Sequence, residues 1–250
     1  MKLHVLGSSS NGNGYIMQSS TGESLIIECG LPLIEVKKSL AWRLSGVAAA
    51  VVSHHHCDHA GRVREYSRAG IRIVAPYEVI ERNQPLPFSR IIEPNRGYVI
   101  GKFRVRTLPM THANNDGTAC ECFGYIIEHP EMGRTLFATD TVALPCPIRG
   151  LHHVMIEANY DDEILDRNIA DGIVAGNERA RLQLSHMEIG TVERMMQKID
   201  MTDVVDVLLL HLSSRNADAA SFVRRIAGTT GKPCQIARPG MVINFDKSPY

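Results

Sequence analysis

The histidine-rich loop at residues 54–59 constrains this chain more than any other feature. It reads His54-x-His56-x-Asp58-His59 and directly follows the apolar run 47–52, which we expect to be a buried strand. Imidazole and carboxylate groups are ligands that Zn²⁺ accepts readily, and Mn²⁺ and Fe²⁺ are compatible with them. On an extended segment, alternate side chains point the same way, so His54 and His56 can bind one ion together. Asp58 and His59 fall where the chain turns, which predicts a second, adjacent position.

The composition is that of an ordinary globular protein. The chain has 250 residues, of which 44% are hydrophobic and 22% charged, enough for a sizeable core. The 27 basic and 27 acidic residues balance, so no overall positive field draws the chain to polyanions, although a local basic groove would suffice for nucleic acid. No segment reaches the ~18 apolar residues of a membrane span, so we expect a cytoplasmic protein without membrane contact. The sequence leaves the oligomeric state open.

Strands and helices alternate along the whole chain, which predicts one α/β domain over residues 1–250. The passage through Pro85 and Pro87 is expected to be a loop, because proline disrupts both kinds of element. The expected strands are 3–6, 15–18, 24–28, 47–52, 71–75, 101–108, 123–128, 134–139, 154–157, 204–210, 234–237 and 241–245. The expected helices are 32–44, 60–69, 161–168, 177–184, 185–198 and 216–227.

Two polar segments are each compatible with two interpretations. The glycine- and serine-rich stretch 7–14 predicts either a simple hairpin loop or a backbone-rich loop that a phosphate can approach closely. The expected helix 60–69 carries Arg62, Arg64 and Arg68. These arginines fit a solvated helix face better than a phosphate-binding face.

The six cysteines predict free thiols, because none forms a CxxC pair and the expected compartment is reducing. Cys57 lies inside the histidine loop, where oxidation or stray metal binding could interfere. Cys120-Glu121-Cys122 is the one spacing that suggests a metal, and two ligands alone are weak support for a site.

Three further candidate ligands, His112, Asp140 and His211, each follow an apolar strand. Ligands of α/β sheets concentrate where the carboxyl ends of the strands converge. With the loop, these residues give seven ligands, which suits two divalent ions that share one carboxylate. Such ions lie ~3.5–4 Å apart, and a water between them becomes a hydroxide nucleophile near neutral pH. The expected sets are His54, His56, His112 and Asp140 for one ion, and Asp58, His59, Asp140 and His211 for the other.

The order of these ligands resembles that of the metallo-β-lactamase fold superfamily, over essentially the whole chain. The resemblance implies an αββα four-layer sandwich with the dinuclear site at one edge of the two sheets. The stretch Gly-Ser-Ser-Ser-Asn-Gly-Asn at 7–13 and the passage Glu157-Ala158-Asn159 look like the small bacterial YycJ/WalJ-like branch. The passage 210–216, which contains His211-x-Ser213, resembles the last histidine motif of nucleic-acid-processing members such as tRNase Z.

The same resemblance implies a role for His186, which matches by position and order a histidine that protonates the leaving group in tRNase Z. A structural histidine at a helix start is the alternative. The acidic partner of that histidine has no clear match, because Leu136 stands where it is expected. Asp58, which is also an expected ligand, and His186 are the two candidate catalytic residues.

Departures from relatives narrow the expected function. True β-lactamases of this fold lack a histidine at the position of His59, and flavodiiron oxidoreductases carry an acid at the position of His56. The chain is too short for the inserted domain of RNase J-type nucleases and lacks the glycine- and proline-rich arm of tRNase Z. We therefore expect a metal-dependent phosphodiesterase or exonuclease acting on nucleic-acid ends, with two Zn²⁺ ions, or Mn²⁺ or Fe²⁺, as cofactors. The alternatives are a small-molecule hydrolase, either a cyclic phosphodiesterase or a glyoxalase II-like thioesterase, and a metal-binding protein without catalysis.

Overall fold

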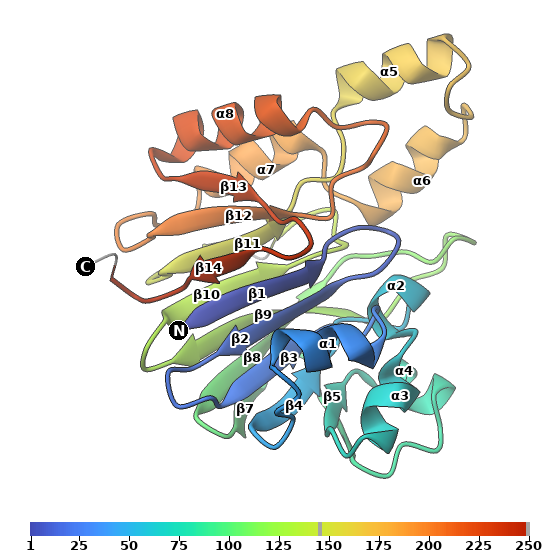
Figure 1. Cartoon of the computed structure of the whole chain (residues 1–250). Helices are drawn as coiled ribbons and strands as arrows, with labels where there is room; N and C mark the ends of the chain where they lie inside the picture. The colour runs from blue at the N-terminus through green and yellow to red at the C-terminus, as the bar shows by residue number, and fades with distance from the viewer. Residues whose placement is uncertain (145–146, 249–250) are drawn as a thin grey trace.

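The computed structural model describes residues 1–144 and 147–248 and places two seven-stranded sheets face to face (Figure 1). The first sheet has the strand order β14-β1-β2-β3-β4-β5-β6 and the second β13-β12-β11-β10-β9-β8-β7. The strands of the first sheet are β1 (Lys2–Gly7), β2 (Gly14–Gln18), β3 (Ser24–Ile27), β4 (Val47–Val51), β5 (Ile73–Ala75), β6 (Ser89–Ile91) and β14 (Val242–Asn244). Those of the second are β7 (Gly97–Ile100), β8 (Phe103–Met110), β9 (Cys122–His129), β10 (Gly133–Ala138), β11 (His153–Glu157), β12 (Asp206–Leu210) and β13 (Cys234–Ile236).

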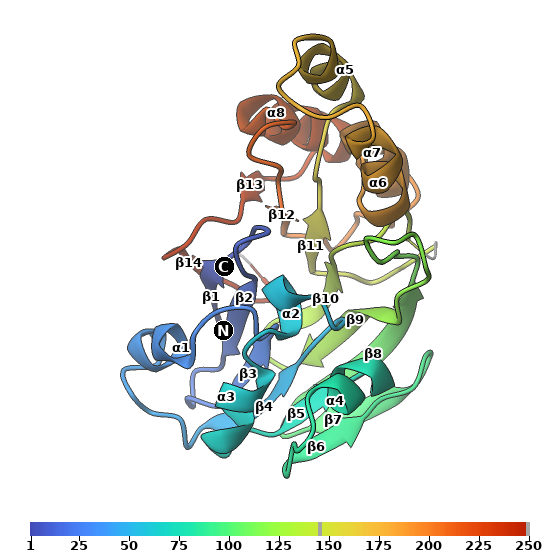
Figure 2. The same ribbon diagram turned by 90° about the vertical axis from the view of Figure 1, so that its right-hand side faces the viewer.

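Helices cover the outer face of each sheet (Figure 2). The helices α1, α3 and α4 pack on the first sheet, and α7 and α8 pack on the second. This arrangement confirms the expected αββα sandwich. The helices are α1 (Leu33–Ser39), α2 (Cys57–Ala60), α3 (Val63–Arg68), α4 (Tyr77–Arg82), α5 (Asp162–Ala170), α6 (Glu178–Ser185), α7 (Ile189–Met196) and α8 (Ala219–Thr230). Among the residues described, no helix is long and apolar enough to cross a membrane.

Alternating side chains along the strands supply both faces of each sheet. In β12, Leu208 and Leu210 enter the core between the sheets, while Val207 and Leu209 pack under α7 and α8. In β3, Leu25 and Ile27 face the central core in the same way. Strands that are apolar on both faces are buried between layers, so the layered fold follows from the composition of its strands.

The segment 161–185 stands apart from the four layers. Figure 1 shows its helices α5 and α6 extending beyond the sheets at the upper right. Its residues Leu165, Val174 and Leu182 form a small apolar cluster with Tyr160, which directly precedes the segment. It lies beside the edge of the second sheet where the candidate ligands converge, because the carbonyl of Ser185 contacts His112.

The structure corrects several expected boundaries. The helix expected at 32–44 ends at Ser39, because Ala41 and Trp42 have positive φ angles of 48° and 64°. The single helix expected at 60–69 is two short helices, α2 and α3, and the expected loop after β5 contains α4 and the edge strand β6. Strand β7 was also not predicted, and Gly101 lies in the β7–β8 turn rather than in a strand.

Local features bear on two smaller expectations. The five cysteines in the ranges described are free, as predicted, and Cys146 lies outside those ranges. Arg64 donates to the carbonyls of Arg82 and Asn83, so it joins α3 to the end of α4.

Candidate metal centre

The candidate ligands gather at one edge of the sandwich because their strands run in the same direction toward it. Strands β8 and β10 are each antiparallel to β9, and β10, β11 and β12 are parallel. Their carboxyl ends, and with them His112, Asp140 and His211, therefore meet at the same edge. Asp140 and His211 have positive φ angles of 48° and 53°, which are strained for residues with a side chain. Such strain costs ~1–3 kcal/mol and is typical of functional sites.

The first expected ligand set forms one cluster. His54, His56, His112 and Asp140 each offer an atom within 4.8 Å of the others. Nε2 of His112 lies 3.1 Å from Nδ1 of His56, and Nε2 of His54 lies 3.8 Å from Oδ2 of Asp140. His112 is fixed from behind by Nδ1, which donates to the carbonyl of Ser185 at 2.9 Å. That bond leaves Nε2 free to ligate, an arrangement common for metal-binding histidines.

The second expected set forms a neighbouring cluster that shares Asp140 with the first. Nε2 of His59 lies 3.3 Å from a carboxylate oxygen of Asp58 and 3.3 Å from Oδ2 of Asp140. Nε2 of His211 lies 3.2 Å from Oδ2 of Asp58. The structure thus brings all seven side chains together in the two sets that the sequence predicts, and their role as ligands stays a prediction.

Unpaired atoms in the first cluster fit a bound cation. Nδ1 of His54 is 2.9 Å from the hydroxyl of Ser53, while its Nε2 is buried without a hydrogen-bond partner among the described residues. A buried imidazole nitrogen normally has a partner, because losing one costs ~1–3 kcal/mol. Three histidines and a shared carboxylate form a donor set that suits Zn²⁺, so the residues present fit a divalent metal.

The charges of the two clusters differ. Burial lowers the pKa of His112 to about 4 and that of His54 well below its ordinary value, so both rings are neutral and have a lone pair for a metal. Burial opposes a charge on His211, but Asp140, Asp58 and Glu157 together raise its pKa to about 10. Burial likewise favours neutral Asp140, but His211 and His59 outweigh it and hold its pKa well below the usual range. The carboxylates of the second cluster therefore attract a cation, and protons compete with a metal there.

His186 lies beside the second cluster and has an acidic partner that the sequence analysis missed. Its Nδ1 is 2.6 Å from Oε1 of Glu157, and its ring stacks on that of His211 with centroids 5.4 Å apart. The sequence analysis looked for this acid at the position of Leu136, and that position was wrong. Leu136 packs into the core under α7 and α8, away from His186. Glu157 ends β11, and its position at the carboxyl end of an apolar strand is the signal that could have identified it.

Glu28 is a second acidic residue that the sequence analysis did not single out. It follows β3 with a positive φ of 68° and is completely buried. Its carboxylate accepts the N–H of Ser53 and lies 3.5 Å from Nδ1 of His59. Glu28 therefore fixes the start of the histidine loop and places a buried carboxylate beside one candidate ligand.

The stretch 7–14 forms the β1–β2 connection and packs on the histidine loop. Nδ2 of Asn13 is 3.0 Å from Nε2 of His59, and the hydroxyl of Ser8 accepts the N–H of His211 at 2.9 Å. At Gly30, a Cβ atom would collide with the carbonyl oxygen of Asp58. The stretch 7–14 and Gly30 thus support the histidine loop closely from the side of the first sheet.

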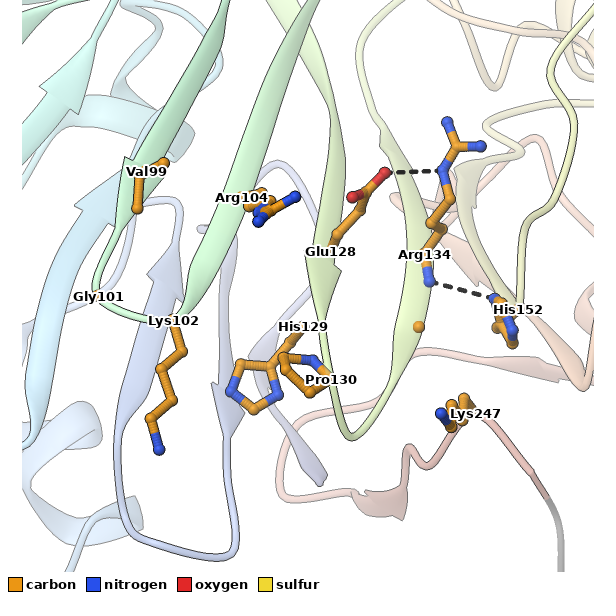
Figure 3. A pocket seen from close by; sticks show the side chains of 11 residues that line it. Val99, Gly101, Lys102, Arg104, Glu128, His129, Pro130, Arg134, His152 and Lys247 are labelled. Carbon is orange, nitrogen blue, oxygen red and sulfur yellow. Dashed lines mark hydrogen bonds and ion pairs between the residues drawn. The ribbon is translucent and has the colours of Figure 1, made fainter.

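Two cavities differ in their relation to the clusters. A cavity of about 420 Å³ is lined by Asn114 and Ser185, which contact His56 and His112 respectively, and by Arg181 of α6. A second cavity of about 610 Å³ lies at the opposite edge of the second sheet, among Lys102, Arg104, Glu128, His129, Arg134, His152 and Lys247 (Figure 3). Of these two cavities, the first adjoins residues that contact the clusters, although none of the candidate ligands lines it.

Comparison with known proteins agrees with this architecture. A family model described as "Beta-lactamase superfamily domain" matches residues 26–212. The metallo-β-lactamase fold protein YhfI from Bacillus subtilis superposes with a TM-score of 0.71 at 17% identity, covering 97% of this chain and 98% of its own. Zn²⁺-bound PqqB from Methylobacterium extorquens superposes with a TM-score of 0.73 at 11% identity, covering 98% of this chain and 100% of its own. The short form of human tRNase Z superposes with a TM-score of 0.63 at 13% identity, covering 98% of this chain and 99% of its own. No curated protein sequence matches the chain.

At these sequence identities, the structural comparisons show only that the fold is shared. The family model, by contrast, matches most of the chain, and it shows the family. The matched region begins in β3 and ends just after His211, so it contains all seven candidate ligands and His186. This chain belongs to the β-lactamase superfamily and has the metallo-β-lactamase fold.

Proposed function

We propose that this chain is a dinuclear metal-dependent phosphodiesterase that acts on nucleic-acid ends. The observation that carries the proposal is the sharing of Asp140 between two adjacent clusters, with a histidine–carboxylate pair beside them. When bound, two divalent ions would neutralise charge on a phosphoryl group and acidify a water. His54, His56, His112 and Asp140 would hold one ion, and Asp58, His59, Asp140 and His211 the other.

His186 supplies a proton to the departing oxygen in this proposal. Its Nδ1 is held by Glu157, so its Nε2 is the ring atom free to carry a proton toward substrate. An atom of its ring lies within 4.8 Å of the ligand atoms offered by Asp140 and His211. Because the carboxylate fixes the ring, little reorganisation is needed at the moment of proton transfer.

The substrate class in this proposal rests on the last histidine motif and on the fold. The cavity beside the clusters adds no net positive charge, because Arg181 pairs with Glu178 and Asp116 also lines it, while Asn177 brings an amide group that can donate hydrogen bonds. The motif His211-x-Ser213 is similar to that of nucleic-acid-processing relatives, and tRNase Z shares the fold. The proposed substrate is therefore a nucleic-acid end.

The size of the same cavity favours a second candidate. A volume of about 420 Å³ is in the range of small-molecule pockets, so a cyclic nucleotide or a thioester could fill it without a polymer. This second candidate function uses the same metal ligands and differs only in the substrate.

A direct assay separates the candidates. Protein loaded with Zn²⁺ or Mn²⁺ is incubated with bis-p-nitrophenyl phosphate, end-labelled single- and double-stranded DNA, cyclic nucleotides and a glutathione thioester. The proposal predicts turnover of the phosphodiesters, with shortening of the labelled DNA, and none by the Asp140→Ala variant. Turnover of the thioester alone, or of no phosphodiester with either metal, would overturn it.

A further inference from the structure

Strand β8 presents a row of basic side chains on the outer face of the second sheet. Successive side chains of a strand alternate, so Arg104 and Arg106 are exposed while Val105 between them enters the core between the sheets. On the neighbouring strand β7, Val99 lies opposite Arg104 and is 70% exposed. Gly97 lies opposite Arg106 and has no side chain to cover it. Among the residues described, no helix lies over β7 and β8 on this side, whereas α7 and α8 pack on the other half of the sheet (Figure 2).

Two adjoining cavities hollow this surface. The cavity of about 610 Å³ in Figure 3 shares Val99, Arg104 and Glu128 with a smaller one of about 300 Å³ on the outer face. Glu128 is the one acidic residue that lines them. The basic residues that line them are Lys102, Arg104, Arg106, Arg134 and Lys247.

The acidic groups nearby do not pair with the row on β8. Oε1 of Glu128 lies 2.9 Å from Nε of Arg134, and Figure 3 shows its carboxylate directed to that side chain. Glu23 accepts the backbone N–H of Lys102 at 3.0 Å, and no described acid forms an ion pair with the Lys102 side chain. The side chains of Lys102, Arg104 and Arg106 thus place three positive charges within five consecutive residues, in a chain whose 27 basic and 27 acidic residues balance.

A row of unpaired cations on an open strand is complementary to a phosphodiester backbone. Arg104 and Arg106 lie two residues apart on one strand, ~6.8 Å along it, so both can reach phosphates of the same nucleic-acid strand. The guanidinium group binds phosphate through two parallel hydrogen bonds, which makes arginine suited to this contact. A Cβ added at Gly97 would meet no atom within 4 Å, so a bulky polymer has room to approach Arg106.

The same strand leads from this row to the candidate metal centre. His112 follows the carboxyl end of β8 six residues after Arg106, so their Cα atoms are at most ~22 Å apart. Duplex DNA advances 3.4 Å per base pair, so about six base pairs cover this distance. The cavity beside the clusters has no excess of positive charge, because Arg181 pairs with Glu178. Electrostatic affinity for a polymer therefore has its source outside that cavity.

We propose that the outer face of β8 binds the phosphodiester backbone of a nucleic acid whose end lies at the metal centre. The inference rests on the proposed function for the reaction at that end. The face itself supplies affinity that is independent of base sequence, because it contacts phosphates and leaves the bases unread.

A binding measurement tests the face separately from turnover. Metal-loaded protein is titrated into a labelled DNA duplex with phosphorothioate linkages, which resist hydrolysis, and fluorescence anisotropy is followed at several salt concentrations. Arg104→Gln/Arg106→Gln should bind more weakly than wild type. The slope of log affinity against log salt should fall in magnitude by about two, because each phosphate contact contributes ~0.9.

Two further variants assign the effect to the face. Arg68→Gln/Arg72→Gln removes two exposed arginines on the side of the first sheet and should bind as wild type does. Val99→Glu keeps both arginines and places a carboxylate directly opposite Arg104, so it should also weaken binding. Thermal unfolding of each variant shows that it is folded.

The possible results are distinct. Equal affinity and salt dependence in the two arginine double variants, or no binding of duplex by wild-type protein, would overturn the proposal. Displacement of the duplex by polyglutamate as readily as by unlabelled DNA would also overturn it, and would identify an acidic polypeptide as the occupant. Failure of wild-type protein to cleave any phosphodiester would contradict the proposed function and leave the binding result to be judged by itself.

Discussion

The carboxylate of Glu157 contacts Nδ1 of His186 at 2.6 Å and Nδ1 of His211 at 3.4 Å, so one buried acid orients two histidines with different proposed roles. Its other oxygen accepts the backbone N–H groups of Thr141 and Met187. These contacts connect the loop after β10, the end of β11 and the segment before α7. The geometry of the proposed proton donor and that of one proposed ligand are therefore coupled.

His186→Ala should keep its metal content while losing rate. General acid catalysis is typically worth ~10²–10⁴-fold, and we expect a loss of kcat in that range on nucleic-acid substrates. The loss should be smaller for bis-p-nitrophenyl phosphate, because p-nitrophenolate leaves without a proton. Kinetics on both substrates, with elemental analysis of the same samples, checks this. Loss of one ion, or equal slowing of both substrates, would show that His186 is a ligand or a structural residue.

Glu157→Gln should lower activity by about 10–100-fold, the usual effect of losing an outer partner of a site histidine. The amide has nearly the same shape but no charge, so it holds the two rings less firmly. If Glu157 acts through His186, the substitution should cost much less in the His186→Ala background than alone. A double-mutant cycle on kcat measures this coupling. Fully additive losses would contradict it and leave only the contact with His211.

The strand-end pattern was enough to predict the two clusters, because it depends only on which residues follow apolar runs. The partner of His186 could not be predicted in the same way, because it requires knowledge of which face of a strand meets the site. Leu136 occupies β10, but its side chain points toward the helices, whereas Glu157 ends the neighbouring strand. Glu28 was missed because it was included in the predicted strand 24–28.

The resemblance in ligand order implied the four layers, but the short elements at the sheet edge could not be predicted. Strand β6 has three residues and α4 has six, and prolines precede and follow this helix, so local sequence favours a loop there. Tertiary packing decides the outcome: Val79 and Ile80 of α4 are buried against the first sheet. The break between α2 and α3 likewise depends on the fold, because the backbone carbonyl of Cys29 accepts the N–H of Arg62 across the loop.

Gly30→Ala should disturb the histidine loop. The added Cβ would collide with the backbone carbonyl of Asp58, which cannot move without displacing Asp58 and His59. We expect weaker metal binding and a lower Tm, measured by competition with a chelator and by thermal unfolding. Gly70→Ala provides a control with open space around the new Cβ, although its φ of +84° makes some loss of stability expected there too. Unchanged metal affinity in Gly30→Ala would show that the loop adapts without cost.

Tyr125→Phe should destabilise the protein by about 1–3 kcal/mol, because it leaves a buried carbonyl without its donor. The Tyr125 hydroxyl donates to the carbonyl of Val52 at 2.5 Å, immediately before the histidine loop. The ring itself stays packed between the sheets, so the change removes only the hydrogen bond. Denaturant unfolding measures the effect. Tyr77→Phe, at an exposed tyrosine, should change stability little by comparison, and equal losses in both variants would contradict the assignment.

Asp140→Ala should lose bound metal and activity together, because Asp140 is the only residue common to both clusters. Asp58→Ala should by contrast weaken mainly the second ion, since the first set does not include Asp58. Removing all metal with a chelator should lower the Tm of the wild-type protein, because ligand binding to the folded state stabilises it. The same chelator should change the Tm of Asp140→Ala much less. Elemental analysis, an activity assay and thermal unfolding, with and without chelator, give all four results. Retention of two ions by Asp140→Ala would show that each cluster holds its ion independently and that Asp140 does not bridge them.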